Sequence, residues 1–360
     1  MGRVVVRSVL GAVAVVAVLV LAGVGYRAVE QHRRAKAAEI TTPNGIDEAR
    51  FVRIGGLDQW ITIRGQDRSN PVLLILDGGP GAASSQDIPS GLEKDFTVVG
   101  WDQPGAGKTF GRAGRRIGPD VGIDSIAGDG IGVAEYARRR LGRGKVGLFA
   151  VSFGTIIGVH MIRLRPDLFY AYVGSGQVVN MRRGEALDYW AVLAEANARD
   201  DLQAMQELEH SLPPPYRSIT ELRTQRKWAM AYEAGAPNGL AVIASVLSAP
   251  RYSLTDASNW MAGFLASQEH FFGEAVDGPG MDVDLPALGT DFAVPFFVFQ
   301  GIDDHVTPFA LAKAYVDSVR APQKLLIAIP GAGHSVAASH AGDFRKFMVE
   351  RVRPLGLEAG

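Results

Sequence analysis

Continuous apolar runs and amphipathic stretches alternate along most of the chain. Runs typical of strands buried on both faces occupy residues 71–81, 95–103, 145–152, 169–176, 294–301 and 323–331. Helix-length amphipathic stretches lie at residues 124–141, 154–164, 308–319 and 337–352. Strand and helix in succession predict right-handed crossovers and an α/β fold, with a mostly parallel central sheet and helices on both faces. The chemistry of such a fold is expected at the carboxyl ends of the strands.

Two other segments break this alternation. Residues 51–56 and 58–65 alternate between apolar and polar positions, which predicts two antiparallel strands. Residues from about 180 to 285 have helical spacing, a proline break at 212–215 and no convincing strand. We interpret this segment as a helical lid. The predicted organisation is therefore an anchor and connector at 1–36, a first part of the core at 37–180, a lid at 181–285 and a second part of the core at 286–360.

The N-terminal region carries an uncharged run of 19 residues, at positions 8–26. At about 1.5 Å per helical residue, the run approaches the roughly 30 Å thickness of a bilayer core. It predicts an uncleaved, single-pass N-terminal transmembrane helix and a membrane location. A cleaved signal peptide is the second interpretation and a buried core helix the third. Basic residues lie on both sides of the run, so the side of the membrane is left open: Arg3, Arg7, Arg27, Arg33, Arg34 and Lys36.

Composition narrows the functional classes. The chain has 360 residues, of which 47% are hydrophobic and 21% charged, as expected of a globular protein with a large core. The net charge of -1 gives no basic excess for nucleic acid. The absence of cysteine excludes disulfides, a cysteine nucleophile and thiolate metal sites.

The stretch WDQPGAGKTF at residues 101–110 resembles the end of a phosphate-binding P-loop, because Gly107, Lys108 and Thr109 spell GKT. A P-loop places glycine five positions before its second glycine, so that backbone amides converge on phosphate. Here that position is Asp102, whose charge opposes phosphate. Nucleotide binding is therefore the weakest of the functional hypotheses.

Ser152 directly follows a buried strand and precedes a helix, in the sequence AVSFG. A nucleophile elbow holds serine in a strained turn and needs small residues two positions before and after it. Ala150 and Gly154 meet this need, although Ala150 replaces the usual glycine. The pattern makes Ser152 the candidate nucleophile.

A serine nucleophile needs a base and an acid that orients the base. Two later strands end in suitable residues, because Asp303 and Asp304 follow one of them and His334 follows the next in a glycine-bounded turn. Of the seven histidines, His305 and His340 are the nearest rivals, yet neither follows a strand in a glycine-flanked loop. The residues alone leave the choice between the two aspartates open.

Acyl transfer also needs amide donors that face the developing oxyanion. One candidate is the N–H of Phe153, just after the serine. The glycine-rich loop at residues 77–81 is the expected source of the second, with Gly79 as the candidate.

Five ordered motifs now resemble those of the proline iminopeptidase-type members of the α/β-hydrolase fold, a peptidase family S33-like group: DGGPG, WDQPGAGKT, AVSFGT, GIDDHVTP and GAGH. The resemblance covers about residues 50–180 and 290–350. It implies a serine hydrolase in which Asp304, rather than Asp303, is the acid. It also implies that residues 102–109 form a turn that shapes the floor of the site. Four positions depart from the family's motifs: Asp77, Pro104, Thr109 and Ala150. Asp77 is expected to turn its side chain away from the oxyanion.

These residues predict hydrolysis through an acyl-enzyme, with a small molecule or short peptide as substrate and with no metal or organic cofactor. The resemblance favours an aminopeptidase in which lid carboxylates bind the substrate's α-ammonium. Four lid glutamates are available and none is singled out: Glu185, Glu195, Glu207 and Glu209. A carboxylesterase or lactonase on the same triad is the competing enzyme, and a catalytically silent, membrane-tethered binding protein is the alternative of another class. Oligomeric state is left open.

Overall fold

The computed structural model describes residues 2–83, 91–233 and 239–360, without the side chains of 2–9, 11–16 and 19–20. Eight strands form one sheet in the order β1-β2-β4-β3-β5-β6-β7-β8. Pairing is parallel from β4 to β8 and antiparallel at β1 and β2. Their bounds are β1 Ile46–Ile54, β2 Leu57–Gly65, β3 Val72–Leu76, β4 Thr97–Trp101, β5 Val146–Val151, β6 Phe169–Ser175, β7 Phe296–Gly301 and β8 Lys324–Ile329. All eight predicted strands are confirmed.

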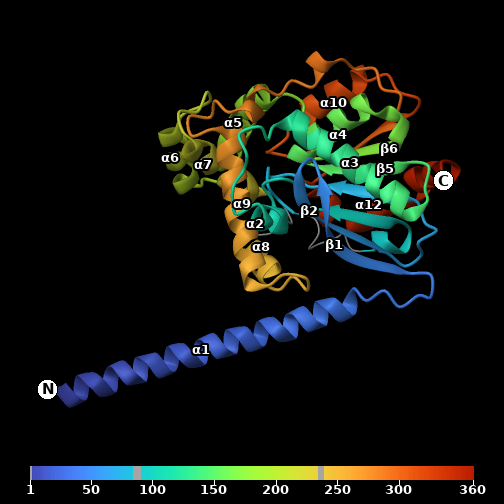
Figure 1. The fold of residues 1–360 in the computed structure, drawn as a ribbon. Helices are drawn as coiled ribbons and strands as arrows, with labels where there is room; N and C mark the ends of the chain where they lie inside the picture. Colours follow the sequence, from blue (N-terminus) through green and yellow to red (C-terminus); the bar gives the residue numbers. More distant parts are fainter. Residues whose placement is uncertain (1, 84–90, 234–238) are drawn as a thin grey trace.

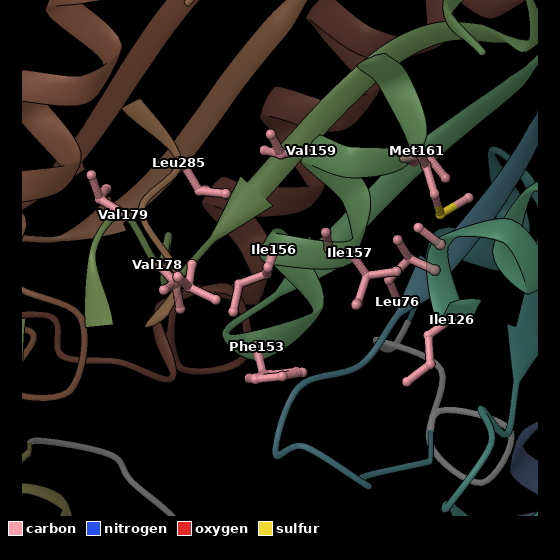
Figure 2. Close-up of a cluster of buried hydrophobic side chains, with 14 of the residues drawn as sticks. Leu76, Ile126, Phe153, Ile156, Ile157, Val159, Met161, Val178, Val179 and Leu285 are labelled. Atoms are coloured by element: carbon pink, nitrogen blue, oxygen red, sulfur yellow. The ribbon is translucent and has the colours of Figure 1, made fainter. Parts of the chain in front are cut away.

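The centre of the sheet is buried on both faces, and its strands β3 and β5 carry no polar side chain. On β3, Leu74 and Leu76 join one core cluster, while Leu73 and Ile75 join a second one on the opposite face. The first face is covered by α3 (Ile123–Leu141), α4 (Phe153–Leu164) and α10 (Phe309–Ser318). Figure 2 shows this first cluster, in which side chains of α4 pack together with Leu76, Ile126 and Leu285.

The second face is covered by the C-terminal helices. The prediction of one helix over residues 337–352 is wrong, because the chain turns at His340, with φ −117° and ψ 45°. The segment forms α11 (Val336–Ser339), α12 (Ala341–Phe347) and a π-helical turn at Met348–Val352, followed by α13 (Arg353–Glu358). Phe344 and Phe347 of α12 pack on Phe299 of β7, with ring centroids 5.3 and 6.1 Å away.

The segment between β6 and β7 is helical, and its described residues contain no strand, as predicted. Its helices are α5 (Met181–Ala198), α6 (Leu202–Ser211), α7 (Ile219–Tyr232), α8 (Gly239–Leu247) and α9 (Leu254–Phe272). Four of them begin where a side chain accepts a hydrogen bond from a first-turn amide, which fixes those helix starts: Asn180, Asp201, Ser218 and Ser253. Figure 1 shows these helices gathered beside the sheet, and we call them the lid.

The N-terminal helix α1 (Gly2–Ala37) extends along one side of the molecule (Figure 1). Arg27 and Gln31 attach it to the lid, donating to the carbonyls of Leu247 and Ala249 at 2.8 Å. The predicted transmembrane helix is not found, because no helix in the described part of the chain is both long and apolar enough to span a bilayer. Several side chains of the run at 8–26 lie outside that part. The location of the protein stays a prediction from the sequence.

Candidate active site

Ser152 lies in the sharp turn between β5 and α4. Its φ of 52° and ψ of −126° lie in a region that residues with a side chain rarely adopt. The turn is held because the Ser152 amide donates to the Ser175 carbonyl of β6 at 2.9 Å. The start of α4 also lies so close to the end of the neighbouring strand β3 that a Cβ on Gly154 would overlap the Leu76 carbonyl oxygen. This is the close approach that the small residue after the serine was expected to permit.

The loop at residues 77–81 packs against this turn. A Cβ on Gly78 would lie 2.7 Å from the Ser152 Cβ and 3.1 Å from the Phe153 amide nitrogen. Phe153 begins α4, so its amide is one of the first four of the helix, which have no intrahelical acceptor. Gly79 follows with φ 108°, a conformation that favours glycine. The oxyanion roles of Gly79 and Phe153 stay predictions: Phe153 follows the serine directly, and Gly79 follows Gly78, the loop residue that lies against the serine.

Asp304 follows β7 and is almost fully buried. Its Oδ1 accepts from the amides of Val306 and Thr307 at 2.9 and 2.8 Å. Its Oδ2 accepts from the Gln300 Nε2 at 2.8 Å and the Thr307 hydroxyl at 2.6 Å. Burial raises the pKa of Asp304, but the His334 imidazole and these hydrogen bonds outweigh it, so that the pKa lies below its ordinary value. Asp304 is therefore a fixed, ionised carboxylate.

His334 follows β8, and its Nδ1 lies 3.1 Å from the Asp304 Oδ2. Asp303, the alternative acid, is exposed. Burial lowers the pKa of His334, but the carboxylates of Asp304 and Glu233 outweigh it and hold the pKa above its ordinary value of 6.5. The structure thus pairs the predicted base with Asp304, as the family motif implied.

Three residues around this pair were missed by sequence reasoning. Gln300 and Thr307 hold the Asp304 carboxylate, and only their places beside the motif GIDDHVTP could have suggested it. Glu233 comes from the end of α7 in the lid, and its Oε1 accepts from the His334 backbone amide. No local pattern marks Glu233, because this contact spans 101 positions of the chain.

Gly176, just after β6, lies against the imidazole of His334. Its φ is 59°, and a Cβ there would lie 2.7 Å from the His334 Cε1 and 2.9 Å from Nδ1. Gly176→Ala is therefore expected to displace the ring and lower kcat by roughly 10- to 100-fold, and the backbone strain costs about 1 kcal/mol of stability. Steady-state kinetics and thermal unfolding measure the two effects.

Gly142 is the matched control for this substitution. Its φ of 64° is nearly the same, but nothing lies within 4 Å of its Cβ position. Gly142→Ala should lower stability by a similar amount and leave kcat unchanged. An equal loss of kcat in both variants would show that Gly176 acts through backbone strain alone.

The loop after β4 forms a polar junction with the lid rather than a phosphate cradle. Asp102 is buried, and its Oδ2 accepts from the Lys108 amide at 2.8 Å and from the Tyr252 hydroxyl at 3.0 Å. The Lys108 ammonium lies 4.3 Å from the centre of the Trp60 ring and pairs with Asp256. The cation expected of a P-loop is thus held by the fold itself.

The lid glutamates predicted as ammonium ligands have different surroundings. Glu195 pairs with Arg199 and Glu207 with Lys227, at 2.7 and 2.6 Å on the lid surface, and Glu209 is exposed. Glu185 alone is buried, where it pairs with Arg226. Among the described residues, no three histidine or acidic side chains gather as metal ligands would.

Comparison with known proteins settles the family. Residues 71–341 match the model of the alpha/beta hydrolase fold. The chain belongs to this family. The hydrolase is 27% identical over 297 residues to the "Probable aminopeptidase YbaC" of Bacillus subtilis (strain 168), covering 78% of this chain and 89% of that one. The predicted membership of the α/β-hydrolase fold is confirmed.

Two solved structures share the fold. The proline iminopeptidase of Mycobacterium smegmatis is 18% identical, with a TM-score of 0.61, over 87% of this chain and all of that one. A proline iminopeptidase-related protein of Thermus thermophilus is 19% identical, with a TM-score of 0.57, over 88% of this chain and all of that one. These similarities show a shared fold, and the family match identifies the protein as a hydrolase enzyme of this fold.

Proposed function

We propose that this hydrolase is an aminopeptidase of the proline iminopeptidase type, in which Ser152, His334 and Asp304 act as a catalytic triad. The serine hydroxyl attacks the carbonyl carbon of the first residue while His334 takes its proton. Asp304, bonded to the imidazole Nδ1, keeps Nε2 free to accept that proton. The amides of Gly79 and Phe153 hold the negatively charged oxygen of the tetrahedral intermediate.

The amine then leaves with the proton from His334, and the acyl group stays on Ser152. Water attacks the ester as His334 takes a proton from it, and the proton returns to the serine oxygen as the ester breaks. The products are a free amino acid and the shortened amine or peptide. Every proton in this cycle passes through His334.

One observation carries the preference for a substrate with a free amino group. The lid residue Glu233 binds the backbone of His334 through Oε1, while its buried Oε2 has no hydrogen-bond partner among the described residues. A buried, unpaired carboxylate oxygen costs free energy unless a donor meets it. The α-ammonium of a peptide bound with its first carbonyl at Ser152 is such a donor.

A pair of substrates tests this preference. Glu233→Gln should reduce kcat/KM for proline p-nitroanilide by about 10- to 100-fold, because it removes the charge that meets the ammonium. Hydrolysis of p-nitrophenyl acetate, which has no amino group, should change by less than about threefold. Glu209→Gln is the control, since that lid glutamate is exposed. If wild-type protein cleaves the ester but not the anilide, the enzyme is a carboxylesterase instead.

The acidic limb of the pH profile gives a separate prediction. His334 acts only when neutral, and its pKa is raised, so kcat/KM should fall as pH falls through a value above 6.5. Removing the negative charge of Glu233 removes one cause of that rise. In Glu233→Gln the limb should therefore move to lower pH, as measured on p-nitrophenyl acetate across about pH 5 to 9. A limb that stays in place would argue against contact between the two charges.

A further inference from the structure

The lid helix α9 lies against the loop at residues 77–81, which carries the proposed oxyanion donor and is called the oxyanion loop below. A Cβ on Gly79 would lie 3.2 Å from the Cε2 atom of Phe264 in α9. Two residues further along the loop, a Cβ on Gly81 would lie 2.6 Å from the Ser267 Cβ. One face of α9 therefore packs along the backbone of the oxyanion loop.

The same face of α9 holds the loop after β4. The Ser267 hydroxyl donates to the Gly105 carbonyl at 3.1 Å, and Ser267 is 1% exposed. A Cβ on Gly263 would lie 2.6 Å from the same carbonyl oxygen. The loop after β4 is bonded to the oxyanion loop in turn, because the Gln103 Nε2 donates to the Asp77 carbonyl at 3.0 Å. Ser267 thus lies at the junction of α9 with both loops.

The second proposed oxyanion donor, Phe153, also lies against α9. Its ring centroid is 5.2 Å from that of Phe271 and 6.2 Å from that of Phe272, at the end of the helix. Nearer the middle of the helix, Phe264 stacks on Trp260 with ring centroids 5.5 Å apart, which fixes the ring that lies against the oxyanion loop. A single helix of the lid therefore spans both halves of the proposed oxyanion hole.

The oxyanion loop needs this support because its own residues restrain it little. Three of its five residues are glycine, and φ is 108° at Gly79 and 88° at Gly81. Glycine has more accessible backbone conformations than any other residue, so it does not hold an amide in one direction by itself. An oxyanion donor stabilises the transition state only when its direction is fixed in advance. Packing from outside the loop has to supply that restraint.

We propose that Ser267 of the lid is a positioning residue, which holds the oxyanion loop so that the Gly79 amide faces the oxygen that develops negative charge. The inference rests on the proposed serine mechanism and gives the lid a part in the chemical step. Because Ser267 is buried, it acts through the loop and does not touch the substrate.

Ser267→Ala tests the role by removing the hydroxyl that meets the Gly105 carbonyl. The rate at which a fluorophosphonate labels Ser152, and kcat for p-nitrophenyl acetate, should both fall by about tenfold. This is less than the roughly 100- to 1000-fold loss expected when a whole donor is removed. KM should stay within about twofold, because the contact matters in the transition state. Ser258→Ala, which removes the same group from the exposed side of α9, should leave all three values within about twofold of wild type.

Gly263→Ala tests the same junction by adding volume instead of removing a bond. Its Cβ would lie 2.6 Å from the Gly105 carbonyl oxygen and push α9 away from the loops. We therefore expect kcat to fall by about tenfold or more, although alanine favours a helix more than glycine does. Gly128→Ala in α3 is the control, because nothing lies within 4 Å of its Cβ position, and its kcat should not change.

The outcomes separate this inference from the proposed mechanism. If wild-type protein is labelled at Ser152 but Ser267→Ala behaves like Ser258→Ala, the triad works without this contact and only the positioning role is refuted. A higher KM with unchanged kcat would place Ser267 in substrate binding and also overturn the proposal. Wild-type protein that stays unlabelled would refute the triad and the positioning role together. Thermal unfolding of each variant verifies that it is folded at the temperature of the assay.

Discussion

Ser152→Ala is expected to lower kcat by roughly four to six orders of magnitude on both anilide and ester substrates. The hydroxyl is the only group that the substitution removes, and the Cβ that defines the strained turn stays. The Ser175 carbonyl still receives the backbone amide, so the fold should persist. Thermal unfolding within about 2 °C of wild type, together with steady-state kinetics, measures the two effects.

Labelling with a fluorophosphonate distinguishes this enzyme from a silent binding protein. Wild-type protein should be labelled at Ser152, and Ser152→Ala should not be. His334→Ala should be labelled much more slowly, because the hydroxyl loses its base. A wild-type chain that stays unlabelled while properly folded would refute the proposed triad.

Asp304→Asn is expected to lower kcat by about four orders of magnitude. The amide is nearly the same size, but its NH₂ group would face the imidazole Nδ1 and favour the tautomer that cannot accept the serine proton. Four hydrogen-bond donors now meet the Asp304 carboxylate: the side-chain amide of Gln300, the backbone amides of Val306 and Thr307, and the hydroxyl of Thr307. In the variant these donors would meet a carboxamide. Kinetics on p-nitrophenyl acetate measure the loss, with unfolding temperature as the test for a stability effect.

The neighbouring residue supplies the control. Asp303→Asn makes the same chemical change one position earlier, at an exposed side chain. Its kcat should stay within about twofold of wild type. The reverse pattern, with activity lost in Asp303→Asn and kept in Asp304→Asn, would assign the acid to Asp303 and contradict the motif alignment.

The central strands were predictable because they are almost entirely apolar, as β3 and β5 illustrate, whereas β1 and β2 were predicted from their alternation of apolar and polar residues. Such runs indicate burial on both faces without knowledge of their neighbours. The C-terminal helix was not predicted correctly, because an amphipathic pattern continues across His340 while the backbone turns there. Periodicity reports which residues face the core and is insensitive to a single turn between two short helices.

The residues of the candidate site could be picked out from the sequence where they follow a strand. Ser152 directly follows β5, and Asp304 and His334 lie in the loops after β7 and β8; the ends of such parallel strands meet at one edge of the sheet. Glu233 and Gly176 were not foreseen. Both act on His334 from distant parts of the chain, and such contacts come from tertiary packing that no local spacing encodes.

The lid leaves the core after β6 and returns to β7, and these two strands are direct neighbours in the sheet. The first and last residues of the lid are also hydrogen-bonded to each other. The Met181 amide donates to the Val283 carbonyl at 3.1 Å, and the Leu285 amide donates to the Val179 carbonyl at 2.8 Å. The entry and exit of the segment are therefore a fixed, short span apart. Changes of length within residues 181–285 should therefore leave the pairing of β6 with β7 intact, whereas exchange of the whole lid would also remove the contacts of Glu233 with His334 and of Tyr252 with Asp102.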